Sequence, residues 1–448
     1  MFHCHAKSLL LVLFVLSGNV IFAQTSASGS NPSNGRENNP YSKYGIGELV
    51  NGNNAVLRGM GNITSAYANP YKVNTDNPAS YSFLERTTFE VGAVASTRTV
   101  HGLMNGVDQS YKTGTATLAY LNMAVPINKR GGLNFGFRPQ THVYYSLSDT
   151  MRTTSTPPSP IGDVERRYNG EGALNYAFLG GSARYNGLSL GFNAGYLFGT
   201  IRNSSYLAPF DTSSLYDNSF RAEFSNYSRI GGIQWKGGLQ YETRLDSTHT
   251  LRFGGTISMG QKVTQHFSEF HISSYYFGDT ITRDTSVNIN EQKGKITLPL
   301  SYSIGVMLAR NNKWAIGIDY AATQWSDFKS DLSAGLTTGI AGSAYKLSAG
   351  GELTPDADNI KRYLSRATYR IGAYYGTDYL QLKGQALPYY GITAGVSLPF
   401  KRSLSQLHAA VDAGVLGTTN NGLNRHNYVR FTLGISMNDL WFVKRKYE

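Results

Sequence analysis

The chain of 448 residues has one cysteine, Cys4, and only 16% of its residues are charged. A single thiol excludes a disulfide framework and a cysteine-ligated metal site. Beyond residue 23 the chain has no apolar run of about 18 residues, which excludes membrane-spanning helices. Clusters of cysteine and histidine, glycine loops that cradle phosphate and nucleophile elbows are also missing. We therefore expect no metal site, no cofactor and no enzymatic activity.

Glycine and aromatic residues are abundant, with 49 Gly, 31 Tyr and 21 Phe. Together with a mean hydropathy of -0.29, this composition is typical of a transmembrane β-barrel, whose lipid-facing residues are diluted by alternation with polar ones. The formal net charge is +12. Nucleic acid is one interpretation of such an excess, but no basic helix or basic arm supports it. An anionic lipid surface is the better partner, and we expect no nucleic acid.

Residues 1–23 have the pattern of a secretory signal peptide. A short, weakly basic head precedes the apolar run at 9–16, which is too short to span a bilayer, and cleavage is expected after Ala23. A buried apolar strand is the alternative, but it fits poorly at the N-terminus beside the polar, Ser/Asn/Gly-rich residues 25–40. Cys4 would leave with the signal peptide.

Residues 86–448 alternate between large apolar side chains and small or polar ones, with a period of two. In the stretch 187–199, one face carries residues such as Leu190 and Phe192, and the other carries residues such as Asn193. The same pattern recurs at 251–260, 313–321 and 429–437. One large apolar face and one small or polar face in each strand predict an all-β, antiparallel, up-and-down transmembrane barrel.

About fourteen such strands are expected, within the even-numbered range of outer-membrane barrels. Their expected ranges are 86–96, 114–125, 132–147, 170–184, 187–199, 226–243, 250–267, 295–309, 313–326, 344–354, 365–377, 388–399, 405–416 and 428–437. A soluble β-sandwich or propeller also alternates, but its outer faces would be polar and its motifs would recur blade by blade. No fixed repeat period is present, which favours the membrane barrel.

The expected connections alternate between long and short. The long ones are 97–113, 148–169, 200–225, 268–294, 327–343 and 417–427, with a modest loop at 378–387 on the same side. The short ones on the other side include 127–132, 184–187, 244–250, 309–313 and 400–405. Long outer loops and short periplasmic turns are usual in these barrels, so we expect the outer membrane as the location and both termini in the periplasm. Nearly every short turn carries Lys or Arg, which predicts a basic periplasmic rim.

Residues 24–85 precede the first expected strand and are rich in Gly, Asn and small residues. A barrel of about fourteen strands leaves a lumen that is open unless something occupies it. Irregular backbone is tolerated at membrane depth only where protein or a wet cavity satisfies its polar groups. We therefore expect residues 24–85 to form a hatch inside the lumen. A disordered leader outside the barrel is the alternative, because composition alone does not separate the two.

The stretch LRGMGNITSAYANPYKVNTDNPASYS, residues 57–82, resembles the N-terminal signature of the FadL-like family, the outer-membrane barrels related to the long-chain fatty acid transporter. The shared features are a Met-Gly pair, small residues and an Asn-Pro-Ala triplet just before the first strand. In this chain the expected hatch motif comprises Gly59, Met60, Gly61, Asn77, Pro78 and Ala79. The resemblance implies a barrel of about fourteen strands with an N-terminal hatch.

What the resemblance implies about function is divided. Some members carry hydrophobic molecules inward, past the hatch and out through a lateral opening in the wall; others are barrel subunits of larger machines, as in type IX secretion. The expected outer loops here are polar, with scattered Tyr as at 271–280, and lack the apolar helical hairpin with which fatty-acid transporters gather ligand. We expect passage of small hydrophobic compounds across the outer membrane. The alternative is a non-transporting subunit of a secretion or assembly complex.

Three smaller features have ordinary explanations. His271 and Ser273 could form a nucleophilic pair, but they lack the surrounding residues of barrel phospholipases and are expected in a loop. Asp356 and Asp358 could bind calcium, but a turn with solvated carboxylates is the better interpretation. Aromatic residues near expected strand ends suit the membrane–water interface; they are Trp235, Trp314, Trp325, Tyr144, Tyr145, Tyr389 and Tyr390.

Overall fold

The structure is a computed structural model, and it describes residues 37–104, 107–152, 163–209, 217–277, 280–310, 313–332, 340, 342–359, 361–401 and 403–441. The expected signal peptide (1–23) and the first part of the expected hatch (24–36) lie outside the described residues. In the part of the chain that is described, no helix is long and apolar enough to cross a membrane.

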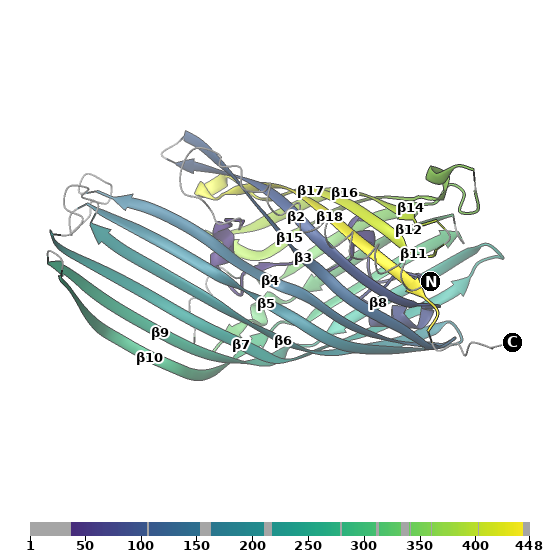
Figure 1. The fold of residues 1–448 in the computed structure, drawn as a ribbon, viewed down its shortest axis with the longest axis horizontal. Helices are drawn as coiled ribbons and strands as arrows, with labels where there is room; N and C mark the ends of the chain where they lie inside the picture. The colour runs from purple at the N-terminus through teal and green to yellow at the C-terminus, as the bar shows by residue number, and fades with distance from the viewer. Residues whose placement is uncertain are drawn as a thin grey trace, which may run out of the picture.

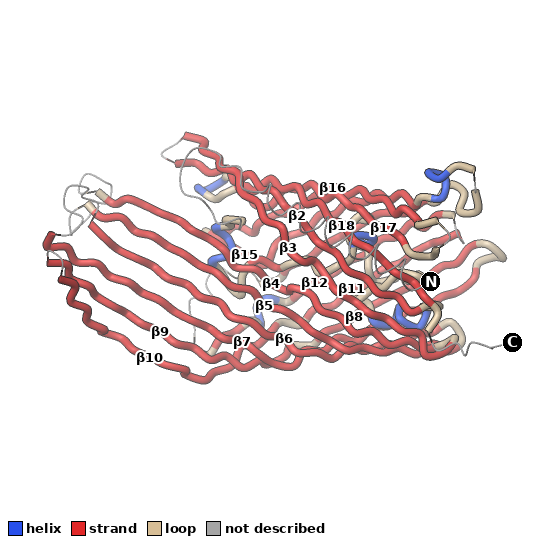
Figure 2. The backbone as a smooth tube through the Cα atoms, viewed as in Figure 1, coloured by secondary structure: helices blue, strands red, loops and turns tan. Residues whose placement is uncertain are grey.

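The strands form one antiparallel sheet that closes on itself as a barrel (Figure 1, Figure 2). The strands are β1 (Glu48–Leu49), β2 (Thr87–Met104), β3 (Val107–Asn128), β4 (Gly131–Met151), β5 (Val164–Tyr185), β6 (Leu188–Pro209), β7 (Asp217–Arg244), β8 (His249–Ser258), β9 (Gln261–Phe277), β10 (Thr280–Leu298), β11 (Ser301–Arg310), β12 (Trp314–Thr323), β13 (Lys329–Ser330), β14 (Ala344–Leu353), β15 (Thr368–Leu382), β16 (Gln385–Pro399), β17 (Gln406–Gly417) and β18 (Arg425–Asp439). The short helices are η2 (Pro40–Lys43), α2 (Ala55–Arg58), η3 (Pro78–Phe83), η4 (Trp325–Asp327), η5 (Tyr363–Arg366) and η6 (Asn420–Gly422). The last strand, β18, pairs with β2 along its whole length and closes the barrel.

The wall of the barrel has 14 strands. β8 and β9 are two parts of one wall strand, and both pair with β7. β10 and β11 are likewise two parts of the next one, interrupted at residues 299–300. The closed antiparallel barrel and its strand number confirm the expected fold class, and the first wall strand begins at Thr87, one residue after the expected start.

Successive side chains of a wall strand point alternately to the outer and inner face, as the period of two predicts. In β6 the outward Leu190 and Phe192 are 54% and 50% exposed, whereas the inward Ser189 and Asn193 are 0% and 2% exposed. Exposed apolar residues of this kind lie on strands around the wall, for example Ile233 of β7, Ile371 of β15 and Phe431 of β18. Outward apolar residues form the band that a β-barrel presents to lipid.

One end of the barrel, which we call the short-turn end, carries tight turns. The turn between β5 and β6 consists of Asn186 and Gly187, whose φ angles are 46° and 84°. Two residues with positive φ match the twist of the flanking strands, and Asn-Gly is the sequence that adopts this turn most easily. The short connections expected from the sequence are therefore confirmed at this end.

The opposite end, which we call the long-hairpin end, differs in part from the expectation of long loops, although the loop expected at 417–427 is present between β17 and β18. β6 continues to Pro209 and β9 to Phe277, and the loop expected at 378–387 is a tight turn at residues 383–384. The expectation is wrong for the extensions of β6 and β9 because a strand that has left the membrane no longer needs an apolar outer face. Its sequence then lacks the apolar alternation that identifies a strand.

The wall is taller on one side, where β4, β5, β6, β7, β9 and β10 extend beyond the other strands at the long-hairpin end (Figure 1). β10 is the last strand of this extension and pairs with β9 along its length. On its other edge, pairing within the described residues is confined to Ile296 and Thr297, which pair with β13. Among the described residues, the edge of this extension at β10 is therefore unpaired over most of its height.

Residues 37–86, which we call the N-terminal segment, run along the inner face of the wall. Their short elements η2, β1, α2 and η3 are joined by turns, and Figure 1 shows them enclosed by the strands. Val56, Leu57 and Met60 are fully buried and belong to the same apolar cluster as Met307 and Ala315 of the wall. The lumen is therefore filled by packed protein over the height of this cluster.

Candidate functional site

Asparagine side chains hold the irregular backbone of the N-terminal segment together. Asn39, Asn54 and Asn77 cap η2, α2 and η3 by accepting a hydrogen bond from a backbone N–H in the first turn. The Asn74 Nδ2 donates to the carbonyl oxygen of Tyr67 at 2.9 Å. Because buried backbone amides rarely remain unpaired, a segment without long helices or strands needs such side chains. This need accounts for its asparagine-rich composition.

Gly59, Met60 and Gly61 of the expected hatch motif lie where the segment approaches the wall most closely. A Cβ atom on Gly59 would lie 2.9 Å from the Cα of Gly395 in β16, and one on Gly61 would lie 2.8 Å from the carbonyl oxygen of Ala349 in β14. Gly61 also has a φ of 69°, a conformation that costs glycine nothing. The Met60 side chain is fully buried. The two glycines therefore allow the backbone of the N-terminal segment to contact the backbone of the wall.

Asn77, Pro78 and Ala79 form a second contact with the wall. The Asn77 Oδ1 accepts the N–H of Ala79 at 3.1 Å, and the Ser189 hydroxyl of β6 donates to the carbonyl oxygen of Ala79 at 2.6 Å. A Cβ atom on Gly191 would lie 2.3 Å from the carbonyl carbon of Pro78, so the wall is bare where the proline lies. All six motif residues are thus placed at contacts between segment and wall, and their role in a hatch stays a prediction.

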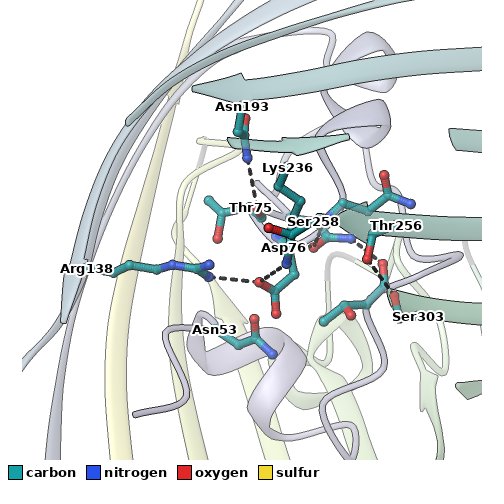
Figure 3. Close-up of polar contacts among 12 residues, drawn as sticks. Asn53, Thr75, Asp76, Arg138, Asn193, Lys236, Thr256, Ser258 and Ser303 are labelled. Atoms are coloured by element: carbon teal, nitrogen blue, oxygen red, sulfur yellow. Dashed lines mark hydrogen bonds and ion pairs between the residues drawn. The ribbon is translucent and has the colours of Figure 1, made fainter. Parts of the chain in front are cut away.

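Asp76 ties the segment to two basic residues of the wall (Figure 3). Its Oδ1 lies 2.9 Å from the Arg138 guanidinium of β4 and 3.3 Å from the Lys236 ammonium of β7. Burial alone would raise the pKa of Asp76, but Lys236 and Arg138 lower it well below its usual range. The carboxylate therefore stays ionised and keeps both contacts.

Acidic residues of the wall bind backbone N–H groups of the segment. The Asp319 carboxylate of β12 accepts the N–H groups of Thr64 at 2.5 Å and Ser65 at 2.7 Å. The Glu90 carboxylate of β2 accepts the N–H of Val73 at 3.0 Å. These bonds pair backbone N–H groups that would otherwise be buried without an acceptor. The two carboxylates therefore fix the irregular part of the segment at membrane depth.

Arg98 of β2 is the centre of an ion network at the start of the segment. Its side chain is 1% exposed and contacts Glu37 and, at 2.6 Å, Glu48. Glu48 also lies 3.0 Å from Arg430 of β18. The network joins residues 37–48 to the two strands at which the barrel closes.

The wall has a seam between β3 and β4. The two strands pair from the short turn only as far as Leu121 and Phe137, although β3 continues to pair with β2 and β4 with β5 toward the long-hairpin end. Within the described residues, β3 and β4 form no further pair beyond that point. The sheet is therefore split over the part of these two strands that lies nearer the long-hairpin end.

The N-terminal segment lies in the seam and pairs with the freed edge of β4. β1 forms two antiparallel pairs with β4, between Glu48 and His142 and between Leu49 and Thr141. Further hydrogen bonds join Asn39 N to Tyr144 O and Val50 N to Gln140 O, each at 2.9 Å. On the other side, the Asn38 N–H donates to the Thr113 hydroxyl of β3 at 2.8 Å. Residues 38–50 thus bridge the seam.

A cavity of about 750 Å³ lies inside the barrel beside the seam. Its lining includes residues of both strands that border the seam, such as Leu118 of β3 and Phe137 of β4. Aromatic residues of the lining are Trp325, Tyr345, Tyr374, Tyr379, Tyr389 and Tyr428; charged residues are Glu37, Glu48, Arg58, Asp76, Arg138, Lys346, Asp378, Asp412 and Arg430. The cavity therefore offers aromatic rings together with acidic and basic side chains to an occupant.

Three aromatic residues expected at the membrane interface point into the lumen instead. Trp325 is 4% exposed and stacks on Tyr379 with ring centroids 4.4 Å apart. Tyr145 belongs to the same buried apolar cluster as Trp325 and Tyr379, and Tyr389 packs against this cluster. The expectation is wrong for Tyr145 and Tyr389 because neighbours in a strand face opposite sides, and for Trp325 because it lies in η4 rather than in a wall strand. Of the pair Tyr389 and Tyr390, only Tyr390 is exposed on the outer face.

The two other candidate sites from the sequence, the His271 and Ser273 pair and the Asp356 and Asp358 pair, have ordinary local contacts in the structure. His271 and Ser273 lie in β9 rather than in a loop, and the His271 Nε2 is bonded to Glu269 at 2.8 Å. The Asp356 carboxylate accepts the N–H of Asp358 at 3.3 Å, which fits the expected turn. Among the residues that the structure describes, no group of three or more His, Cys, Asp or Glu side chains could hold a metal ion.

The sequence interpretation missed the charged residues on the inner face of the wall. Small or polar side chains were expected on the inner face, without buried ion pairs, yet Glu90, Arg98 and Arg370 are all buried there. The available signal was one isolated charge at an inward position of an alternating strand, as in TFEVG at 88–92. A lone inward charge needs a partner, and in this barrel the N-terminal segment supplies several.

Comparisons with known proteins agree with this architecture. The model of the family described as BamG matches residues 6–448. A search of curated proteins found no match.

Solved structures with a similar fold include three barrels. The toluene transporter TodX of Pseudomonas putida is 16% identical, with 87% of this chain and 99% of that chain covered and a TM-score of 0.56. A FadL homologue of Pseudomonas aeruginosa is 12% identical, with 87% and 99% covered and a TM-score of 0.55. The monoaromatic hydrocarbon channel CymD is 14% identical, with 88% and 98% covered and a TM-score of 0.52. At these identities the likeness establishes the fold.

Proposed function

The chain belongs to the BamG family and has the fold of FadL-like outer-membrane barrels, and we propose that it passes small hydrophobic compounds across the outer membrane. The seam between β3 and β4 carries this proposal. It breaks the wall beside the luminal cavity, so a compound in the cavity has a lateral path toward lipid. TodX and CymD, which share the fold, are described as a toluene transporter and a monoaromatic hydrocarbon channel.

The chemistry of the cavity narrows the class of compound. Tyrosine and tryptophan rings bind apolar groups and also tolerate a polar edge. The charged groups of the lining, such as Lys346 and Asp412, favour a compound that carries a polar substituent. A volume of about 750 Å³ falls in the range of small-molecule sites. The fitting compound is therefore small and apolar with one polar group.

The N-terminal segment would act as the hatch of this path. It fills the lumen on the short-turn side of the cavity, and residues 38–50 occupy the seam itself. The motif residues Gly59, Met60, Gly61, Asn77, Pro78 and Ala79 would anchor the part of the hatch near the short-turn end, while the pairs with β4 and the ion network of Arg98 would hold residues 38–50 in the closed position. The hatch would comprise residues 24–85, followed by the barrel to residue 448.

The orientation follows from the two ends of the barrel. Short turns face the periplasm in barrels of this kind, and longer hairpins face outward. The N-terminal segment enters the wall at Thr87 and β18 ends at Asp439, both at the short-turn end. Both termini would therefore lie in the periplasm.

A disulfide across the seam tests the path. Leu49 and Thr141 are directly paired, and opposed residues of antiparallel strands have the Cα spacing that a disulfide requires. In a C4S background, the variant L49C/T141C should lose uptake of a small phenolic or aromatic reporter when oxidised and regain it on reduction.

The matched control is M123C/F135C, a pair in the part of β3 and β4 that is already joined. Its oxidation should leave uptake unchanged. Full uptake by the oxidised L49C/T141C variant, with the disulfide verified by mass spectrometry, would show that compounds do not pass through the seam.

A second candidate function is that of a barrel subunit in a larger outer-membrane complex. The free edge of β10 in the tall extension favours it, because exposed strand edges add strands from other chains. Affinity purification from native membranes followed by mass spectrometry tests this function. Recovery of the barrel without stoichiometric partner proteins would argue against it.

A further inference from the structure

A cluster of basic residues crosses three adjacent strands on the outer surface of the barrel. Arg229 of β7 lies opposite His266 of β9, which lies opposite Lys293 of β10. Lys262 of β9 and Lys295 of β10 follow on the same face toward the short-turn end. Directly opposed residues of antiparallel strands point to the same side of the sheet. These five side chains therefore share one surface, which we call the basic row.

The basic row lies where the apolar outer band ends. On β6 the outward positions from Leu188 to Phe198 are apolar, a stretch of about eleven residues that matches one membrane-spanning strand. The next outward position on β6, Thr200, is opposite Arg229. Between β8 and β9, which both pair with β7, Met259 is 53% exposed just before Lys262. The basic row therefore lies at the membrane boundary of the long-hairpin end.

A groove of about 600 Å³ opens on the same surface and touches the basic row. Tyr196 and Phe198 line it on the membrane side, and Arg229 and His266 line it on the other side. Its floor is the bare backbone at Gly231, where a Cβ atom would lie 2.7 Å from the Tyr196 hydroxyl. The groove thus combines aromatic rings at the depth of acyl chains with the Arg229 guanidinium at the depth of headgroups.

The positive charge of the basic row is largely uncompensated. Arg229 forms an ion pair with Glu291 at 2.7 Å. Within the described chain, Lys262, Lys293 and Lys295 form no side-chain ion pair, although the Lys295 backbone N–H donates to the Asp331 carboxylate at 3.0 Å. A concentration of cations at a membrane boundary attracts anionic headgroups.

We infer that the groove and the basic row bind the phosphate-bearing headgroup of a lipid in the adjacent leaflet. The lysines and Arg229 would contact the phosphate, because charge-assisted bonds from Arg and Lys are the usual means of binding it. Tyr196 and Phe198 would pack against the first part of the acyl chains. This site faces lipid and does not depend on what passes through the lumen.

Native mass spectrometry of the full chain with added diphosphoryl lipid A tests the inference. The variant R229Q/K262Q/K293Q/K295Q should bind lipid A at least tenfold more weakly, since each basic residue near an anionic surface accounts for about a fivefold change. A second variant, G231L, keeps every charge but fills the groove. It should also weaken lipid A binding. Monophosphoryl lipid A should bind the native chain more weakly than the diphosphoryl form.

The matched control removes four exposed basic residues of the short-turn end, in the variant K313Q/K361Q/R362Q/K401Q, and should bind lipid A as the native chain does. Inorganic phosphate at the same concentration should not displace the lipid. Unchanged binding by the first variant, or full competition by inorganic phosphate, would overturn the inference. Loss of a co-purifying protein without any change in lipid binding would overturn it as well and would indicate a protein interface.

Discussion

Replacing Arg98 with Met should release the start of the N-terminal segment from the wall. The Arg98 side chain is almost fully buried and contacts both Glu37 and Glu48. Without it, the two carboxylates remain in the lumen with less compensation of their charge. Removing one partner of a buried ion pair costs about 3–5 kcal/mol.

The remaining contacts place the effect at the lower end of that range. Glu48 keeps Arg430 at 3.0 Å, and its side chain is 20% exposed, so solvent and a second cation compensate part of the loss. A cost of about 3 kcal/mol corresponds to a roughly hundredfold increase in local opening, because 1.4 kcal/mol is about tenfold. The effect should be local, since Asp76, Asn77 and Glu90 still hold the lower part of the segment.

Hydrogen–deuterium exchange followed by mass spectrometry measures this opening. Peptides covering 37–50 should exchange about a hundredfold faster in R98M, while peptides covering 72–84 should not change. The control R166Q breaks an exposed pair with Asp149 and should leave both regions unchanged. The triple variant R98M/E37Q/E48Q should recover much of the protection. Unchanged exchange at 37–50 in R98M would refute the role assigned to the network.

Three further predictions follow from the geometry. G61V should expose residues 54–66 to exchange without opening the barrel, because a branched side chain at a φ of 69° costs about 1–2 kcal/mol and its Cβ would meet the wall. The control is G342A, whose Cβ would contact nothing within 4 Å. Equal exchange in both variants would contradict the close approach. K383C, at the long-hairpin end, should react with an impermeant maleimide on intact cells, and S403C, at the short-turn end, should not. The reverse labelling would invert the proposed orientation. The pKa of Asp76 lies below its unfolded value, so its contribution is complete above that value and is lost only as the pH falls through the folded pKa. Protection of residues 75–80, a range that leaves out Val73 and its bond to Glu90, should therefore be constant between about pH 5 and pH 9, and a decline within that window would contradict the ion pairs with Arg138 and Lys236.

The barrel itself could be predicted because its determinants are local. Leu190 and Phe192 alternate with Ser189 and Asn193 along one strand, and a period of two needs no knowledge of the rest of the chain. The Asn186–Gly187 turn is equally local. Where β6 and β9 leave the membrane, the lipid-facing pattern ends, so the sequence pattern predicts loops for their extensions.

The candidate site depends on contacts that are distant in sequence. The motif residues were found by resemblance, but Gly59 against Gly395 and Pro78 against Gly191 join positions that nothing in the sequence relates. The inward Arg98 becomes interpretable only when Glu37 and Glu48 lie beside it. Tyr145 and Trp325 were placed at the membrane interface because aromatic residues suit both lipid boundaries and closed lumens.

The sequence by itself determined an antiparallel membrane barrel, its approximate strand number and the presence of an irregular segment before the first strand. Hydrophobic alternation and turn chemistry specify these features within a few residues of chain. Only the tertiary structure decided that β3 and β4 separate, that residues 38–50 lie in that seam and that the cavity opens beside it. Those features arise from pairing between strands and a segment far away in the chain, where geometry in three dimensions, not the local pattern, selects the partner.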